Sequence, residues 1–182
     1  YSIGQMLKDL PGIASQGLGN ASRPIIRGLG NSRVKILQNG SSLTDVSEFG
    51  EDHIVGYDPI LIDKIEVIKG PGTLLYGNNG FAGVVNIINP LIAIDKPLAD
   101  ENYELGFGYK TSGGELGTAL KLSKSVENFT IRGSGSLLSS GPYDLANVST
   151  KQANSSKFMT SGGVGITYND GENFIGLSVD KL

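Results

Sequence analysis

The sequence predicts an α+β domain over residues 1–97, followed over residues 98–182 by antiparallel strands of a transmembrane β-barrel. Three observations support this fold class. Residues 1–90 mix a short helical pattern with apolar runs of strand length, and the chain beyond residue 100 alternates apolar and polar side chains in five segments. Between them, Asp95, Lys96 and Pro97 interrupt both patterns in the manner of a linker.

The composition limits the kinds of protein that this chain can be. Its 182 residues include 27 glycines spread along the chain, which favours many tight turns. The net charge of −3 gives no electrostatic reason to expect nucleic acid as a partner. The lack of cysteine excludes disulfides, and no apolar run reaches the roughly 18 to 20 residues of a membrane-spanning helix. Residues 1–4 do not begin a signal peptide, so we expect a mature or truncated chain.

The first segment predicts a helix, a loop and a strand. Ser2 can cap a helix over residues 3–10, which a Pro-Gly pair then ends. Residues 13–22 are small and polar, so we expect a loop there. A short apolar run at residues 24–28 predicts the first strand.

The next segment predicts a strand, a turn and an acidic loop. Residues 34–37 are apolar enough for a strand, and Asn39-Gly40 after them is a strong turn signal. Residues 41–57 are irregular and acidic, and they contain His53, the only histidine of the chain.

Residues 58–90 predict a central strand–turn–strand unit. The first run, residues 62–68, alternates apolar and polar side chains with a period of two. The second run, residues 81–88, is β-branched and almost continuously apolar, as expected for a strand covered on both faces. Glycines and a proline between the runs favour tight turns rather than a phosphate-binding loop, because no Gly-Lys-Ser/Thr follows them.

The last part of the chain predicts five amphipathic strands in meander order. Their alternating cores are residues 103–109, 116–122, 129–133, 164–168 and 175–179. Short connections at residues 112–115, 127–128 and 169–172 contrast with a long polar one at 141–157, as in outer-membrane barrels. A soluble β-sandwich would show the same period, so the pattern alone leaves both architectures open. Five strands cannot close an even-numbered barrel, and we therefore expect a fragment of a longer protein.

Six short motifs follow one another along the first ninety residues. They are residues 3–12 (IGQMLKDLPG), 26–29 (IRGL), 34–40 (VKILQNG), 65–71 (IEVIKGP), 74–77 (LLYG) and 83–88 (GVVNII). In this order they resemble the TonB-dependent outer-membrane receptors. The resemblance covers residues 1–90 by motif and the strands beyond residue 101 by pattern.

The resemblance implies a plug domain folded inside a barrel of about 22 strands in the bacterial outer membrane. It implies that a scarce nutrient binds the outer face of the plug, and that a TonB-type energy-coupling protein pulls on a segment upstream of Tyr1. Expected partners are this coupling protein, outer-membrane lipid and a metal ion or metal chelate, with no nucleic acid and no tightly bound cofactor. With one histidine, no cysteine and no nucleophile-elbow pattern, the sequence predicts no enzyme.

The acidic loop carries a narrower resemblance. Residues 22–28 (SRPIIRG), 36–40 (ILQNG) and 49–59 (FGEDHIVGYDP) are similar to the zinc-uptake branch of these receptors. In that branch an Asp-His pair of the loop ligates metal, which implies that Asp52 and His53 are ligands here and that Zn²⁺ is the transported substrate. Glu51 stands where the branch usually has proline.

The chemistry of these side chains agrees with a zinc site but does not complete one. Imidazole and carboxylate both ligate Zn²⁺, which takes about four ligands. Asp45, Glu48 and Glu51 could add oxygens, or the missing ligands could come from barrel loops beyond this chain. His53 could also be an ordinary loop histidine. An iron-siderophore or haem receptor and a non-transporting β-rich surface binding module remain alternatives.

Three further charged residues have structural and functional interpretations. Arg27 could contact substrate, but an arginine that pairs with carboxylates is the more common case in a packed domain. Glu66 and Lys69 are expected to form ion pairs with each other or with the barrel wall.

Overall fold

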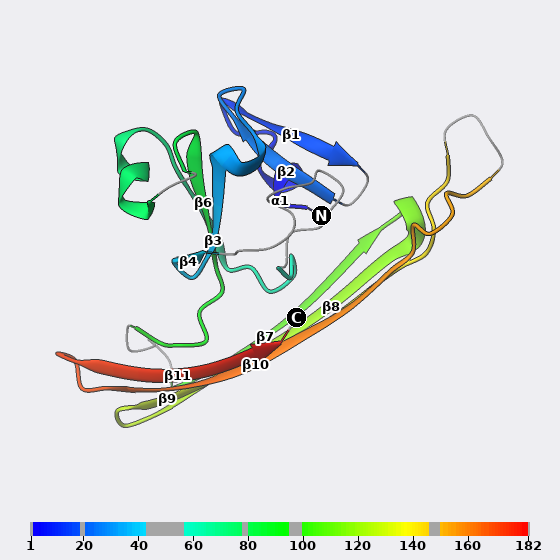
Figure 1. Ribbon diagram of the computed structural model, residues 1–182. Helices are drawn as coiled ribbons and strands as arrows, with labels where there is room; N and C mark the ends of the chain where they lie inside the picture. The colour runs from blue at the N-terminus through cyan, green and yellow to red at the C-terminus, as the bar shows by residue number, and fades with distance from the viewer. Residues whose placement is uncertain are drawn as a thin grey trace. The chain divides into compact units, whose positions relative to one another are not determined.

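The computed structural model describes residues 2–18, 21–42, 57–77, 80–94, 100–145 and 150–181. The chain divides into two compact units, Tyr1–Asn89 and Pro90–Leu182, which are drawn in Figure 1. The boundary that the sequence predicts, between residues 97 and 98, lies outside the described residues. None of the helices in the described ranges has the length and apolar character that a membrane crossing requires.

A short helix, α1 (Ile3–Leu7), opens the first unit. Ser2 caps it as predicted: the Gln5 N–H donates to Ser2 Oγ, and the Ser2 N–H donates to Gln5 Oε1, both at 3.4 Å. The helix ends three residues earlier than the sequence predicts. Leu10 N–H instead donates to the Leu7 carbonyl in a turn, and Leu10 is exposed.

The loop predicted for residues 13–22 is wrong, because these residues form most of a β-hairpin. Strand β1 (Ile13–Leu18) pairs antiparallel with β2 (Ala21–Ile26). Small hydroxyl side chains stabilise it: Ser15 Oγ donates to Ser22 Oγ at 3.0 Å, and Ser22 Oγ also contacts Ser2 Oγ. The polar composition that suggested a loop therefore serves a buried hydroxyl cluster under α1.

The second sheet of this unit has the strand order β4-β3-β6-β5. Its strands are β3 (Val34–Gln38), β4 (Ser41–Ser42), β5 (Lys64–Ile68) and β6 (Gly83–Ile88), with 3₁₀ turns η1 (Asn31–Arg33) and η3 (Pro71–Tyr76). Strand β6 runs parallel to β3 and antiparallel to β5. The prediction of a covered central strand is confirmed, since Val84 and Val85 are both 0% exposed.

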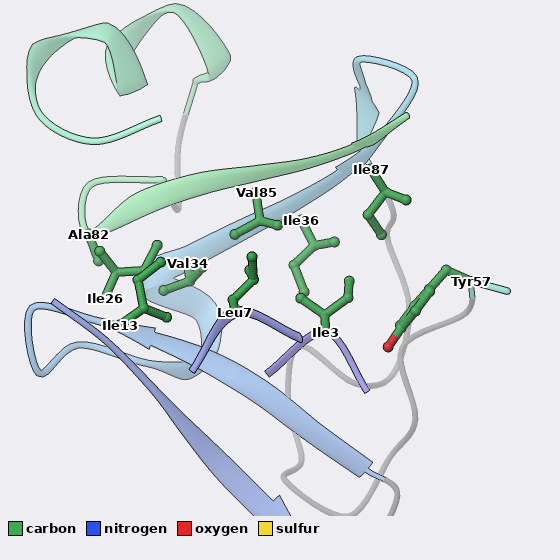
Figure 2. Close-up of a cluster of buried hydrophobic side chains, with 10 residues drawn as sticks. All are labelled: Ile3, Leu7, Ile13, Ile26, Val34, Ile36, Tyr57, Ala82, Val85 and Ile87. Carbon is green, nitrogen blue, oxygen red and sulfur yellow. The ribbon is translucent and has the colours of Figure 1, made fainter. Parts of the chain in front are cut away.

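One hydrophobic core holds α1, the hairpin and this sheet together (Figure 2). The side chains drawn in Figure 2 are Ile3, Leu7, Ile13, Ile26, Val34, Ile36, Tyr57, Ala82, Val85 and Ile87. Burying a Val, Leu or Ile side chain stabilises a fold by about 1.5–3 kcal/mol, so this cluster is the main source of stability in the first unit. Tyr57 belongs to it although it follows the acidic loop.

The second unit is one antiparallel sheet in the predicted meander order, from β7 to β11. Its strands are β7 (Glu101–Lys110), β8 (Glu115–Val126), β9 (Phe129–Ser140), β10 (Lys157–Asn169) and β11 (Phe174–Lys181), with a 3₁₀ turn η4 (Ser112–Gly114) before β8. One face carries large exposed apolar side chains, such as Phe107 at 73% and Leu177 at 76%. The other face carries mainly small and polar residues, as the sequence predicts for a barrel wall.

Residues 90–94 lie against this polar face and belong to the second unit. Ala93 N–H donates to Thr167 Oγ1 at 2.9 Å, and Asn169 Nδ2 donates to the Ile94 carbonyl at 2.6 Å. Arg132 also donates to the Pro90 carbonyl at 3.3 Å. These hydrogen bonds explain why the boundary between the units, after Asn89, comes before the residues Asp95, Lys96 and Pro97 that suggested a linker. Residues 90–94 pack on the sheet of the second unit.

Candidate functional site

Asp52 and His53, the predicted metal ligands, lie outside the described residues, together with Asp45, Glu48 and Glu51. The structure describes the two ends of their loop, at Ser42 and at Tyr57. Within the described ranges no three His, Cys, Asp or Glu side chains are grouped closely enough to hold a metal ion. The candidate site therefore remains a prediction from the sequence. The structure describes the residues on either side of it, which we call its two anchors.

The first anchor is the turn between β3 and β4. Asn39 and Gly40 form this two-residue turn with φ of 49° and 80°. Both values lie in the left-handed region that a type I′ hairpin turn requires, and Asn-Gly is the pair that adopts it most readily. The sequence prediction of a turn here is confirmed, and it fixes the direction in which the chain enters the loop.

Side-chain amides fasten this turn to β6 and to the residue after it. Gly40 N–H donates to Asn86 Oδ1 at 2.9 Å. Asn39 Nδ2 donates to the Asn89 carbonyl at 3.1 Å, and Asn89 N–H donates back to Asn39 Oδ1 at 2.8 Å. The start of the loop is thus held by hydrogen bonds to the central strand of the sheet.

The amide of Asn86 is oriented in turn by a carboxylate. Asn86 Nδ2 donates to Glu66 Oε2 at 3.3 Å, while Lys64 Nζ donates to Glu66 Oε1 at 2.7 Å. The Lys64 hydrogen bond, followed by that of Asn86, lowers the pKa of the Glu66 carboxyl below its usual range. Glu66 therefore stays ionised at neutral pH and keeps the Asn86 Oδ1 atom directed at Gly40.

The second anchor is the pair Tyr57 and Asp58, both buried. Burial raises the pKa of the Tyr57 hydroxyl strongly, a backbone hydrogen bond from Ile3 lowers it in part, and the nearby Asp58 charge raises it further. Tyr57 is consequently neutral across the physiological range. Asp58 Oδ1 accepts from the Ile60 N–H at 2.9 Å, which makes the local turn that leads into β5.

The other charged residues singled out from the sequence have different partners from those expected. Glu66 pairs with Lys64 rather than with Lys69, and Lys69 Nζ donates to the Pro11 carbonyl at 2.8 Å. Arg27 is exposed and has a φ of 52°, and its N–H donates to the Gly12 carbonyl at 2.9 Å. No ion pair of Arg27 is found among the described residues, so its role is that of a turn residue in this part of the chain.

Sequence reasoning missed the amide network of Asn39, Asn86 and Asn89. A signal was present, because Asn86 interrupts an otherwise apolar strand (GVVNII). A polar side chain that is 9% exposed in such a strand needs hydrogen-bond partners. The identity of those partners follows only from the parallel pairing of β3 with β6, which a sequence pattern does not give.

The first unit matches a known protein family. Residues 1–84 match the family model described as TonB-dependent Receptor Plug Domain. The Vitamin B12 transporter BtuB of Vibrio vulnificus (strain CMCP6) is 38% identical over 92 residues, which are 48% of this chain and 14% of that protein. The chain therefore spans about one seventh of the length of this relative.

Solved structures match nearly the whole chain in fold. The Copper transporter OprC superposes with a TM-score of 0.76 at 23% identity, over 98% of this chain and 27% of that one. The FrpB iron transporter of Neisseria meningitidis gives a TM-score of 0.75 at 19% identity, over 97% and 28% of the two chains. The ferric enterobactin receptor PfeA of Pseudomonas aeruginosa gives 0.70 at 20% identity, over 98% and 30%.

Proposed function

We propose that residues 1–84 are a plug domain of the TonB-dependent receptors, proteins of the outer membrane, and that this chain is the plug and first wall strands of a receptor that imports a scarce nutrient. The relatives are transporters and receptors rather than enzymes. A TonB-type protein would supply the energy through a segment upstream of Tyr1. Support comes from the plug match and from a sheet on which most of the large exposed apolar side chains share one face.

The proposed substrate is a divalent metal ion, zinc first, or a small chelate of it. The observation that carries this choice is the Asp52-His53 pair, which supplies a carboxylate and an imidazole side by side. The printed names of the relatives point in the same general direction, since they include copper and ferric enterobactin as well as vitamin B12. An iron chelate or haem is the second candidate, because two of the proteins of similar fold are named for ferric enterobactin and for iron.

In this proposal, the two anchors hold the chain on either side of the metal-binding residues. The Asn39-Gly40 turn and the buried Tyr57 hold the chain just before and just after residues 43–56. Two ligands alone do not make a zinc site, which takes about four. The remaining ligands would come from Asp45, Glu48 or Glu51, or from the rest of the receptor.

Calorimetric titration of the full-length receptor with Zn²⁺ tests this assignment. His53→Ala and Asp52→Asn should each weaken zinc binding by about tenfold or more, which corresponds to about 1.4 kcal/mol. Asp9→Asn is the matched control, since it removes an exposed carboxylate of the same unit outside the loop and should leave the affinity unchanged. Equal zinc affinity in wild type and His53→Ala would refute the site, and tight binding of a ferric chelate without zinc binding would favour the second candidate.

A further inference from the structure

An apolar groove of about 490 Å³ lies in the sheet of the second unit. Its walls are leucines from three strands, and its floor is the backbone around two glycines of β9. The wall residues are Leu105, Leu120, Leu122 and Leu137, and the floor glycines are Gly133 and Gly135. All of these residues belong to the described part of one unit, and the groove spans the edge strand β7 and its neighbours β8 and β9.

The strand register shows that the groove is on the apolar face. Leu120 pairs with Gly135, and Gly135 pairs with Gly162 of β10. Leu122 pairs with Gly133, which pairs with Val164. Because paired residues point to the same face, Gly162 joins the two floor glycines and extends the gap across two strands.

Large apolar side chains surround this gap on the same face. Along β9, Phe129 and Ile131 precede the two glycines and Leu137 follows them, and all three side chains are exposed. Along β10, Val164 and Ile166 follow Gly162 and are also exposed. The glycines therefore interrupt a continuous apolar surface at one place.

Packing does not require glycine at the floor. A Cβ atom at Gly133 would meet only the Gly163 carbonyl oxygen, and one at Gly135 only the Ser161 carbonyl oxygen, each at 3.8 Å. That distance is an ordinary van der Waals contact. Neither residue has a positive φ. The effect of these two glycines is thus to leave open space above the strands rather than to relieve a clash.

The other face of the sheet is occupied by the chain itself. There, Leu91 and Ile92 lie over Gly163, Gly165 and Gly176, where a Cβ atom would come within 2.4–2.6 Å of them. The groove face is the one with exposed leucine, isoleucine, valine and aromatic side chains. In an outer-membrane protein such a face meets the hydrocarbon of the bilayer.

A charged pair on the apolar face indicates where the groove lies relative to the membrane interface. Lys124 Nζ and Glu101 Oε1 are 2.8 Å apart and exposed, two residues along β8 from the groove wall at Leu122. Charged side chains on a lipid-facing surface are tolerated near the interface and are strongly destabilising at the midplane. The pair lies toward the short turns at residues 127–128 and 170–173, which mark the periplasmic rim in outer-membrane barrels.

We infer that this groove binds one acyl chain of a phospholipid from the periplasmic leaflet. The glycine floor and leucine walls offer a long apolar side-on contact, and the Lys124–Glu101 pair places the lower end of the groove just inside the interface. On the far side of Gly162, β11 presents Lys181, whose long side chain can extend along the surface toward water. The inference depends on the outer-membrane location and not on which nutrient is imported.

Photolabelling of the full-length receptor tests the inference. The receptor is placed in nanodiscs of phosphatidylethanolamine and phosphatidylglycerol that contain a phospholipid with a diazirine on its acyl chain, and labelled residues are mapped by mass spectrometry. In wild type, label should concentrate on Leu105, Leu120, Leu122 and Leu137 compared with Phe107 and Ile175 on the same face. Gly135→Leu fills the groove and should reduce this label by about fivefold or more.

Thr160→Leu is the matched control, because it adds the same side chain to β10 on the same face but outside the groove lining. It should leave the groove label unchanged. Label spread evenly over the apolar face of wild type, or unchanged label in Gly135→Leu, overturns the inference. A dimer in native mass spectrometry with the groove leucines protected from label also overturns it, since a second copy would then be the occupant. If Gly135→Leu does not fold, the wild-type map and a Gly133→Ala variant decide the question in the same way.

Discussion

Apolar residues of the same types are buried in the sheet of the first unit and exposed on one face of the sheet in the second. In the first unit, Val84 and Val85 of the central strand are 0% exposed and pack into the core. In the second, Leu177 and Val179 of β11 are 76% and 75% exposed. A water-soluble sheet would bury the second set. The difference teaches that the first unit covers its apolar strand residues with its own core, whereas the second unit leaves one apolar face of its sheet exposed.

The glycines of the second unit repeat this contrast on the two faces of a single sheet. On the polar face, Gly163, Gly165 and Gly176 make room for residues 90–94 of the same chain. On the apolar face, Gly133 and Gly135 have nothing above them but open space. The same residue therefore allows close packing in one place and leaves a groove in the other.

The largest expected effect tests the buried side of the first comparison. Val85→Asp puts a carboxylate into the core without a partner and should destabilise the first unit by about 4–5 kcal/mol. Hydrogen exchange of β3 and β6 in the full-length receptor measures it. Val85→Thr has almost the same shape and no charge, so a loss of only about 1–2 kcal/mol is expected there. Equal protection in Val85→Asp and wild type would show that β6 is not a core strand.

The next effect tests the exposed side of that comparison. Val179→Arg lies well inside the apolar face and should cost about 2–4 kcal/mol when the receptor folds into lipid vesicles. Ile175→Arg on the same strand is beside the short turn at residues 170–173, and it should cost less than about 1 kcal/mol because the interface is near. Chemical unfolding from vesicles gives both values. If the two positions respond alike, this face does not cross a bilayer at the depth proposed.

A smaller effect is expected when a glycine of the polar face and one of the apolar face are each replaced by alanine. In Gly165→Ala the new Cβ would be 2.4 Å from the Leu91 carbonyl oxygen, so residues 90–94 must shift, at about 1–3 kcal/mol. The Ala93 N–H, hydrogen-bonded to Thr167 in the native structure, should then exchange faster with solvent. Gly133→Ala has room for its methyl group and should change stability by less than about 1 kcal/mol. The comparison fails if both variants behave alike.

Much of this fold could be predicted, because period-two alternation is a local signal. The strand–turn–strand unit around β5 and β6, the Asn39-Gly40 turn and the five-strand meander all appear where the sequence indicates them. The hairpin of β1 and β2 could not be predicted in the same way. Its strands carry Ser15 and Ser22, whose hydroxyl groups are satisfied by each other and by Ser2 from another element. Such a cluster becomes visible only when the elements have packed.

The candidate site is predictable in chemistry but not in geometry. Asp52 and His53 stand out because carboxylate and imidazole ligate zinc, and they remain a prediction. The anchors of their loop depend on contacts between residues far apart in the sequence, such as Gly40 with Asn86. Tyr57 shows the same limit, since its place in the core next to an acidic loop follows from tertiary packing and not from its neighbours.

The smallest effect is a pH dependence of the first anchor, set by Glu66. Its pKa lies below its ordinary value of 4.5 because Lys64 and then Asn86 hydrogen-bond the ionised carboxyl. A depressed folded-state pKa contributes stability that is present above the unfolded pKa and is lost as pH falls through the folded pKa. The melting temperature of wild type should therefore decline on acidification below about pH 4.5, and Glu66→Gln should remove that part of the decline. The contribution is small, since Glu66 is solvent-accessible and water screens its charge.

Lys64→Met provides the control for this prediction, because it removes the main cause of the pKa shift while leaving the carboxyl in place. In that variant the decline due to Glu66 should be smaller than in wild type and complete at higher pH, because the folded-state pKa moves back toward the unfolded value. Hydrogen exchange of the Gly40 N–H is a second measurement, which reports on the turn itself rather than on the stability of the whole protein. In wild type this amide should lose protection, measured against its intrinsic exchange rate at the same pH, as Glu66 is protonated and Asn86 loses its orientation, because Asn86 Oδ1 is its acceptor. Parallel acid profiles for wild type and Glu66→Gln, with no change at Gly40, would show that Asn86 holds the turn without help from the carboxylate.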